Sequence, residues 1–396
     1  MISNRKKTED MISLAGLPKN HFLFTSESVA EGHPDKLCDQ LSDAVLDAYL
    51  TQDPNSKVSC DITAKSNLIM AFGEIKSQAV VNIEQVIRKT IKDLGYTGKE
   101  KGLDWEKCCV TININVKESD SKNEEQGKNQ GTVFGYATDE WDKEILFPLT
   151  HYLASQLCLK LAELRKSKEL AWLRPDGKAQ VTMEYVKEKN NLIKPLRVFN
   201  VLVSSQHDKS ISQEDIKKLI IERVIKRVIP QELLDEKTIY YINPSGSFNI
   251  GGPVADAGLT GRKVVADTYG GWIPHGGGAF SGRDPSKVKR TGAYYCRYVA
   301  KSLVANGLCH RVKIQVSYVE GNPKSIFVDS LGTVKEGLTD HNLLMIVLKN
   351  FDFSTSSMIK ELQLERPIYR KTVMWGHFGC KKGEFPWEEP KKNLIM

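Results

Sequence analysis

The strongest chemical signal in the sequence is a glycine-rich segment followed closely by cations. Residues 275–283 read HGGGAFSGR, and Lys287, Lys289 and Arg290 follow within seven positions. Consecutive glycines let backbone N–H groups converge on an anion, which favours a phosphate-binding loop. The Gly-Lys-Ser/Thr ending of a Walker A loop is missing. A glycine-lined turn without a ligand is the alternative that this segment leaves open.

Two further segments place a carboxylate beside cations and a flexible backbone. Residues 256–263 read DAGLTGRK, and residues 172–178 read WLRPDGK. Each segment alone could form a surface salt bridge. Three such segments in one chain favour a site that handles a polyphosphate and a metal ion.

A fourth group of ionisable residues gathers at the start of a predicted helix. Its members are Glu27, Glu31, His33, Asp35 and Lys36. A helix N-terminus favours anions, and carboxylates are the ligands that Mg²⁺ prefers. Aspartates then recur every four residues, at positions 35, 39, 43 and 47. We assign only Asp35 to chemistry and expect the other three to lie on a solvated helix face.

The elements that must position these residues follow from hydrophobic periodicity. Apolar residues at three and four spacing predict helices at 34–48, 86–94, 149–164, 216–224, 291–306 and 341–350. Alternating or continuous apolar runs predict strands at 57–63, 67–75, 109–116, 179–186, 196–204, 312–318 and 325–329. Residues 1–20 read as a flexible arm and residues 117–131 as a polar loop. Helices and strands interleave throughout, which predicts an α/β (α+β) fold.

Composition limits the class of protein. The 396 residues are 40% hydrophobic and 27% charged, as in a globular protein, and no run approaches the roughly 18 apolar residues of a membrane helix. We therefore expect a cytoplasmic protein with no membrane partner. The net charge of +7 comes without a block of Lys and Arg, so we expect no nucleic-acid partner. Eight scattered cysteines without a C-x-x-C pair predict reduced thiols.

Seven ordered motifs resemble those of the S-adenosylmethionine synthetase (methionine adenosyltransferase) family. They are FTSESVAEGHPDK (24–36), FGYATDE (134–140), WLRPD (172–176), GLTGRK (258–263), DTYGG (267–271), HGGGAFSG (275–282) and GHFG (376–379). The match runs in register from about residue 21 to 389. This coverage includes nearly the whole chain, so the resemblance concerns the complete fold.

The resemblance implies three similar domains with pseudo-threefold symmetry, built of mixed sheets flanked by helices. We expect an N-terminal domain at 21–130, a central domain at 131–255 and a C-terminal domain at 256–396, with the chain crossing between them. It also implies a homodimer or tetramer whose active sites lie between subunits.

The resemblance implies a reaction in which the methionine sulfur attacks C5′ of ATP and expels the triphosphate. The triphosphate is then hydrolysed to pyrophosphate and phosphate, with Mg²⁺ and K⁺ as cofactors. The catalytic residues would be His33, Lys178, Arg262, Lys263 and Lys287. ATP would also contact Asp176, Ser245, Gly246, Ser247, Phe248, Asp256, Ala279 and Arg283. Methionine would contact Glu74, Asn129 and Asp256, while Glu27 and Asp35 would bind Mg²⁺ and Asp61 would bind K⁺.

Several residues depart from the family pattern at the site. Asn129 and Lys289 stand where the family has Asp, Ser247 stands for Arg, Arg283 for Lys, Asp61 for Glu, and Glu320 for an apolar residue. The loop before Asn129 is also shorter than the family's gating loop. Two interpretations follow: an active synthetase of a divergent branch, or a non-catalytic or weakly active homologue that binds ATP and pairs with an active synthetase subunit.

Overall fold

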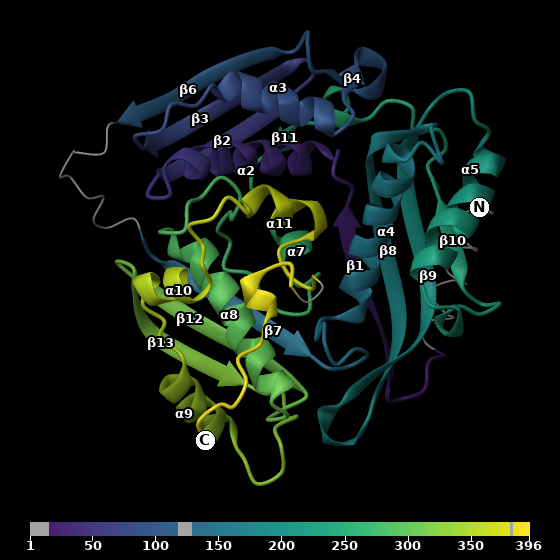
Figure 1. The fold of residues 1–396 in the computed structure, drawn as a ribbon. Helices are drawn as coiled ribbons and strands as arrows, with labels where there is room; N and C mark the ends of the chain where they lie inside the picture. The colour runs from purple at the N-terminus through teal and green to yellow at the C-terminus, as the bar shows by residue number, and fades with distance from the viewer. Residues whose placement is uncertain (1–15, 118–128, 381–382) are drawn as a thin grey trace, which may run out of the picture.

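Three β-sheets of three or four strands, each with one long helix packed on a face, form most of the part of the chain that the structure describes. The computed structural model describes residues 16–117, 129–380 and 383–396. The three long helices have nearly equal lengths: α2 (Pro34–Gln52), α4 (Leu149–Lys166) and α8 (Val288–Ala305). Each helix packs on a strand of its own sheet, and the three units surround a common centre (Figure 1). The predicted α+β fold of three similar units is confirmed.

The β2–β3 sheet carries α2. Its strands, in order, are β11 (Gly258–Leu259), β2 (Lys57–Lys65), β3 (Leu68–Lys76) and β6 (Cys109–Lys117). β2 pairs antiparallel with β11 and β3, whereas β3 and β6 run parallel. In β2, inward-facing residues such as Val58 and Ile62 alternate with polar ones, and they pack with buried residues of α2 and of α3 (Ile83–Asp93). A short ribbon, β4 (Thr97–Gly98) and β5 (Leu103–Asp104), follows α3.

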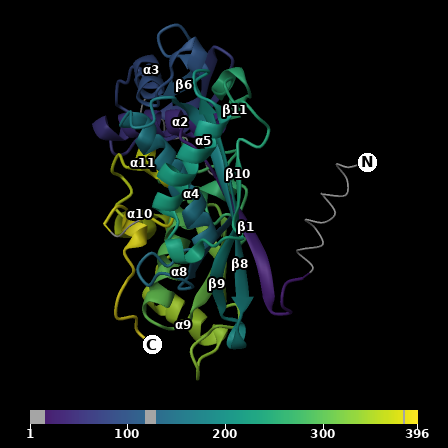
Figure 2. The ribbon, with the colours of Figure 1, turned by 90° about the vertical axis from the view of Figure 1, so that its right-hand side faces the viewer.

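The β8–β9 sheet carries α4. Its strands, in order, are β1 (His21–Val29), β8 (Leu173–Lys187), β9 (Ile193–His207) and β10 (Ile239–Ile242). The connection from β9 to β10 contains α5 (Gln213–Ile220), a π-helical turn (Ile221–Ile225) and α6 (Lys226–Val228). Turned by 90°, this sheet lies along one side of the molecule, and the chain near the C-terminus lies on the opposite side (Figure 2).

The β7–β12 sheet carries α8. Its strands, in order, are β13 (Asn322–Asp329), β12 (Arg311–Val319) and β7 (Gly131–Thr138). α8 lies so close to β7 that a Cβ at Gly135 would come within 2.1 Å of the Cys296 carbonyl oxygen. The remaining helices are α7 (Val264–Asp267), α9 (Asp340–Asn350), α10 (Thr355–Glu361) and α11 (Tyr369–Trp375).

The sheets do not follow the predicted domain ranges. β1 joins strands of residues 173–242, β7 joins strands of residues 311–329, and β11 joins strands of residues 57–117. Each sheet therefore draws one strand from a distant part of the chain. The ranges 21–130, 131–255 and 256–396 stay predictions.

Most predicted helices and strands are found within a few residues of their expected bounds. Sequence reasoning missed the strands β1, β7 and β10, the helices α10 and α11, and the short elements β4, β5, β11, α6 and α7. The predicted arm at 1–20 and the shortened loop lie largely outside the described residues. All eight cysteines are free thiols, as predicted, and only Cys109 is exposed. Within the described ranges, every helix is too short or too polar to cross a membrane.

Candidate active site

His33 caps the start of α2 with its side chain. Pro34 takes the first helical position, where its missing N–H costs nothing, and Nδ1 of His33 accepts a hydrogen bond from the Asp35 N–H at 3.2 Å. A neutral ring that accepts at Nδ1 carries its proton on Nε2. Burial lowers the pKa of His33 to about 4, and the charge of Lys263 adds to this shift. His33 is therefore a neutral hydrogen-bond donor at neutral pH.

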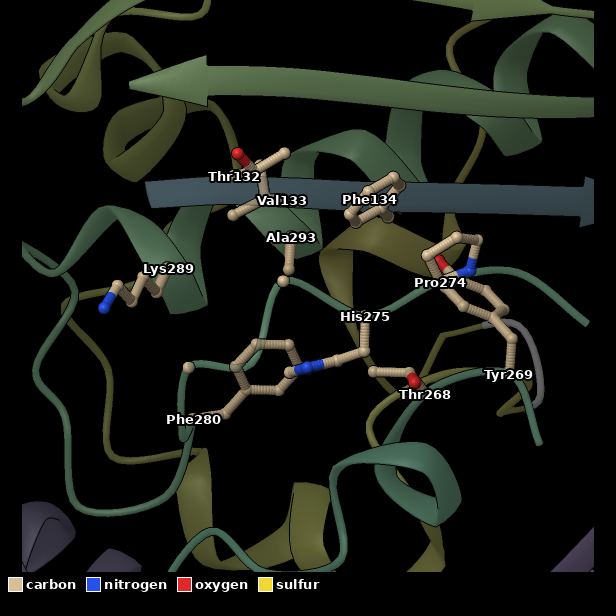
Figure 3. A pocket seen from close by; sticks show the side chains of 12 residues that line it. Thr132, Val133, Phe134, Thr268, Tyr269, Pro274, His275, Phe280, Lys289 and Ala293 are labelled. Atoms are coloured by element: carbon tan, nitrogen blue, oxygen red, sulfur yellow. The ribbon is translucent and has the colours of Figure 1, made fainter. Parts of the chain in front are cut away.

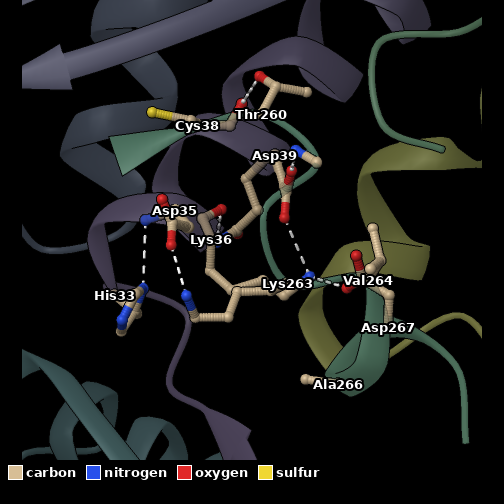
Figure 4. Close-up of polar contacts among 12 residues, drawn as sticks. His33, Asp35, Lys36, Cys38, Asp39, Thr260, Lys263, Val264, Ala266 and Asp267 are labelled. Atoms are coloured by element: carbon tan, nitrogen blue, oxygen red, sulfur yellow. Dashed lines mark hydrogen bonds and ion pairs between the residues drawn. The ribbon is translucent and has the colours of Figure 1, made fainter. Parts of the chain in front are cut away.

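Asp35 gathers two cations beside His33. Its Oδ2 lies 2.5 Å from Nζ of Lys263 (Figure 4). Its Oδ1 lies 3.6 Å from Nη1 of Arg262. The Leu259 N–H in β11 also donates to Oδ1 at 2.9 Å. Burial alone would raise the pKa of Asp35, but the bonds from Lys263 and Leu259 hold it below its usual value. We call His33, Asp35, Arg262 and Lys263 the His33 cluster.

A buried ion bridge fixes the two elements that carry this cluster. Nζ of Lys36 in α2 donates to Asp39 at 3.1 Å and to Asp267 at the end of α7 (Figure 4). Although burial opposes it, the charges of Asp267 and Asp39 raise the pKa of Lys36. α7 begins directly after Lys263, so the bridge holds that lysine near Asp35. Sequence reasoning gave no role to Asp267 or Asp39.

The expectation of a solvated aspartate face on α2 is wrong. Asp39 and Asp43 are fully buried, and Asp47 is partly buried and accepts the N–H groups of Tyr369 and Arg370. Asp43 pairs with Arg290 through two bonds of 2.7 and 2.8 Å. Arg290 is therefore a buried structural cation, although the sequence places it just after the glycine-rich segment. Oδ1 of Asp43 also accepts a hydrogen bond from the Gly282 N–H at 2.8 Å.

The residues expected to hold adenosine lie at the end of the β8–β9 sheet. Asp176 in β8 is buried and accepts the Gly252 N–H at 2.8 Å, and burial raises its pKa to about 6. The negative charge of Asp256 adds to the rise in the pKa of Asp176 and opposes the fall in the pKa of His33. Lys178 is exposed on β8 opposite Val29 of β1.

A loop after β10 presents the other expected nucleotide contacts. Ser245, Gly246 and Ser247 are exposed, and the Ser247 hydroxyl donates to Asn249. Phe248 is half-buried, and Nε2 of His207 accepts its N–H at 3.0 Å. Ser247 thus stands at the solvent edge of this group.

A second group of predicted residues lines a pocket of about 350 Å³, which we call the basic pocket. Its lining residues are Ser59, Gly73, Glu74, Asn129, Gln130, Gly278, Ala279, Arg283, Lys287 and Lys289. Three cations and one carboxylate give this pocket a positive balance. The guanidinium of Arg283 is bound by both oxygens of Asp61 at 2.9 Å, so part of its charge is neutralised.

Lys289 lines both the basic pocket and a neighbouring aromatic cavity. This small cavity is lined by Phe134, Tyr269, His275 and Phe280. The ammonium of Lys289 points away from these rings (Figure 3). The charge is therefore available to the basic pocket.

The two other departures in the described chain lie in different settings. Glu320 is exposed in the turn between β12 and β13, where its charge stays hydrated. The side chain of Asn129 donates a hydrogen bond to the Ser286 carbonyl oxygen and accepts one from the Val288 N–H. Neither residue places an unpaired charge in the interior.

The predicted metal ligands do not form a metal centre by themselves. Lys263 and the Leu259 N–H engage Asp35, and Arg283 engages Asp61, while Glu27 lies exposed on β1. Among the described residues, side chains of His, Cys, Asp and Glu form no group of three that could hold a metal ion. The protein side chains alone therefore do not fit a resident Mg²⁺ or K⁺, and both ions stay predictions.

The His33 cluster and the basic pocket lie at different places along β2. Leu259, whose N–H binds Asp35, pairs with Thr63, whereas Ser59 pairs with Glu74 of the pocket. Four residues of strand separate these positions by about 13 Å. Within one chain the two groups are therefore offset along β2, while Ala279 of the pocket lies against Gly261.

Comparison with protein families accounts for almost the entire chain. The S-adenosylmethionine synthetase N-terminal domain matches residues 21–119, the central domain matches residues 124–248, and the C-terminal domain matches residues 250–389. The three matches follow one another in chain order.

Proposed function

The chain belongs to the S-adenosylmethionine synthetase family, and from that premise we propose that it forms S-adenosylmethionine from methionine and ATP. The observation that carries the proposal is the His33 cluster. It sets a neutral hydrogen-bond donor beside two cations at the N-terminus of a helix. Such a site suits a leaving group that gains negative charge.

The reaction requires no nucleophile from the protein. The methionine sulfur forms a bond to C5′ of ATP while the bond from C5′ to the leaving oxygen breaks, which gives a sulfonium and free triphosphate. Nε2–H of His33 donates to the leaving oxygen, and Lys263 and Arg262 neutralise the phosphates. Alignment of sulfur, carbon and oxygen lowers the barrier through proximity, and the cations stabilise the charge that develops.

The remaining predicted residues complete the substrate sites in this proposal. Asp176, Asp256 and Phe248 hold the adenosine, while Lys178 and Lys287 add positive charge along the triphosphate. Glu74 binds the ammonium of methionine. Mg²⁺ would be held by the phosphates of ATP, whose charge it would help to neutralise, because the side chains described above do not form a metal centre. Water then cleaves the triphosphate to pyrophosphate and phosphate.

We also propose that a second copy of the chain completes each site. Within one chain the basic pocket lies about 13 Å along β2 from the position that serves the His33 cluster. A two-fold dimer could bring the pocket of one copy to the His33 cluster of the other. This arrangement explains why two sets of phosphate-suited cations occur in one protomer.

The experiment is a product assay with the purified protein alone. ATP, methionine, Mg²⁺ and K⁺ are supplied, and S-adenosylmethionine is measured by chromatography, with pyrophosphate and phosphate measured in parallel. The proposal predicts the three products in equal amounts. ATP binding without product would contradict it and would favour a non-catalytic homologue that pairs with an active subunit.

A further inference from the structure

We propose that Asn129 is a positioning residue that holds Lys287 in the basic pocket, a role that rests on the proposed function. Its Nδ2 donates to the Ser286 carbonyl oxygen at 2.8 Å, and its Oδ1 accepts the Val288 N–H at 3.2 Å. These two residues flank Lys287 on either side. One amide side chain therefore fixes the backbone before and after that lysine.

The start of α8 requires such a partner. The first N–H groups of a helix have no acceptor within the helix, and a side chain before the helix usually supplies one. Here Lys287 occupies the capping position and makes no side-chain cap bond, because an ammonium has no acceptor. Asn129 supplies the missing acceptor for Val288 from 159 residues away in the sequence.

The sheet holds Asn129 itself in place. Its carbonyl oxygen accepts the Gly321 N–H at 2.8 Å, in the turn between β12 and β13. Two residues later Gly131 begins β7 and pairs with Tyr318 of β12. The amide is thus mounted on a rigid edge of the β7–β12 sheet, which is what accurate positioning of a binding side chain requires.

The same segment also sets the path of Lys289. A Cβ at Gly131 would lie 2.9 Å from Cε of Lys289, so the glycine leaves room for the lysine stem to cross the chain. Residues 129–131 therefore control both lysines of the basic pocket. This observation links the departure at Asn129 to the departure at Lys289.

The chemistry of the amide distinguishes this role from binding of methionine by Asn129. An amide offers one donor and one acceptor group, whereas a carboxylate only accepts. If Asn129 bound the methionine ammonium, Asn129→Asp would tighten methionine binding, because the new charge would attract the ammonium. If Asn129 instead holds the backbone, Asn129→Asp would break the hydrogen bond to Ser286, because a carboxylate oxygen would face the Ser286 carbonyl oxygen.

The first test measures binding of inorganic triphosphate and of methionine, separately, by calorimetry. We expect Asn129→Asp and Asn129→Ala each to weaken triphosphate binding about tenfold through loss of the clamp, with methionine binding changed less than about twofold. Gln130→Glu is the matched control, because it adds the same charge to the pocket one residue away. Its effect should be smaller and should fade at high salt. Tighter methionine binding by Asn129→Asp would overturn the proposal.

The second test measures the hydrogen bond between Asn129 and Val288 without an activity assay. Hydrogen exchange at the Val288 N–H should accelerate in Asn129→Asp and Asn129→Ala, because that N–H loses its acceptor, and should stay unchanged in Gln130→Glu. Unchanged exchange in all three variants would overturn the clamp. If the wild type binds no triphosphate, the proposed function fails, while the exchange measurement still decides the role of Asn129.

Discussion

The ammonium of Lys263 lies 2.5 Å from Oδ2 of Asp35, a carboxylate that is almost completely buried. The lysine side chain keeps about a quarter of its surface exposed, so it reaches inward from the solvent side. A phosphate that enters the His33 cluster therefore competes with Asp35 for one ammonium. In the protein without ligand, Asp35 therefore holds the ammonium that a phosphate would bind.

Removing the competitor should strengthen anion binding. With EDTA present, we expect Asp35→Asn to tighten inorganic triphosphate binding about fivefold to tenfold, because charge-assisted bonds of Lys263 become available to the ligand. Lys263→Gln should weaken it by a similar factor. Calorimetry of both variants checks the pair. Weaker binding by Asp35→Asn without metal would show that Asp35 does not compete for the lysine.

Breaking the buried pair of Asp43 and Arg290 should destabilise the fold strongly. Arg290→Met leaves Asp43 buried without its cation, which costs about 3–5 kcal/mol. The matched control is Arg370→Met, which breaks a part-exposed pair with Asp93 and should cost less than about 1 kcal/mol. Urea unfolding followed by circular dichroism measures both changes. Equal losses in the two variants would contradict the structural role of Arg290.

Asp176 should make stability depend on pH in the acid range. Burial raises the pKa of Asp176 to about 6 in the fold, above the ordinary value of 3.8. The folded state therefore binds more protons between these two values, and its contribution to stability falls as the pH rises through 6. Asp176→Asn keeps an acceptor for the Gly252 N–H and cannot ionise.

The expected signature of Asp176 is a difference between two melting curves. The gain in melting temperature of Asp176→Asn over the wild type should be larger at pH 7.5 than at pH 4.5. A gain that is the same at both values would show that the carboxyl does not titrate in this range.

Lys289 should act as an anion ligand of the basic pocket. Lys289→Asp reverses a charge beside Lys287, so we expect triphosphate binding to weaken about tenfold or more. Lys335→Asp makes the same change at an exposed site outside the pocket lining and serves as control. A rise in product formation together with a stronger need for Mg²⁺ would instead show that position 289 replaced a metal ligand.

The periodic elements were predictable because their signal is local. The spacing of Leu37, Leu41 and Val45 predicts a helix with a buried face, and in the structure all three residues are buried in α2. β1 was not predicted because the segment FTSESV has polar side chains on both of its faces. Its backbone pairs with β8. Its partner lies over 140 residues away, where no local pattern can show it.

The buried charges of α2 were unpredictable for a similar reason. A carboxylate every four residues looks the same whether it meets water or a buried cation. The partner of Asp43 is Arg290, 247 residues later, and Lys36 meets Asp267, 231 residues later. The motif DTYGG marked Asp267 as noteworthy, yet only the fold shows its contact.

The motifs of the candidate site were predictable, but their use of side-chain atoms was not. The family resemblance implies that Asn129 contacts methionine and Lys287 the triphosphate, and in the structure both residues line the basic pocket. Which way an amide points depends on backbone from another part of the chain. Asn129 therefore became interpretable only through its bonds to Ser286 and Val288.

The central claim is that the His33 cluster of one copy and the basic pocket of another act on one pair of substrates. Co-expression of His33→Gln and Lys287→Gln chains with different tags, followed by tandem purification, gives a mixed dimer with one intact site. With the wild type as reference, we predict about half of its rate of S-adenosylmethionine formation, while each variant alone is inactive. A mixed dimer as inactive as its parents, beside an active wild type, would contradict the claim.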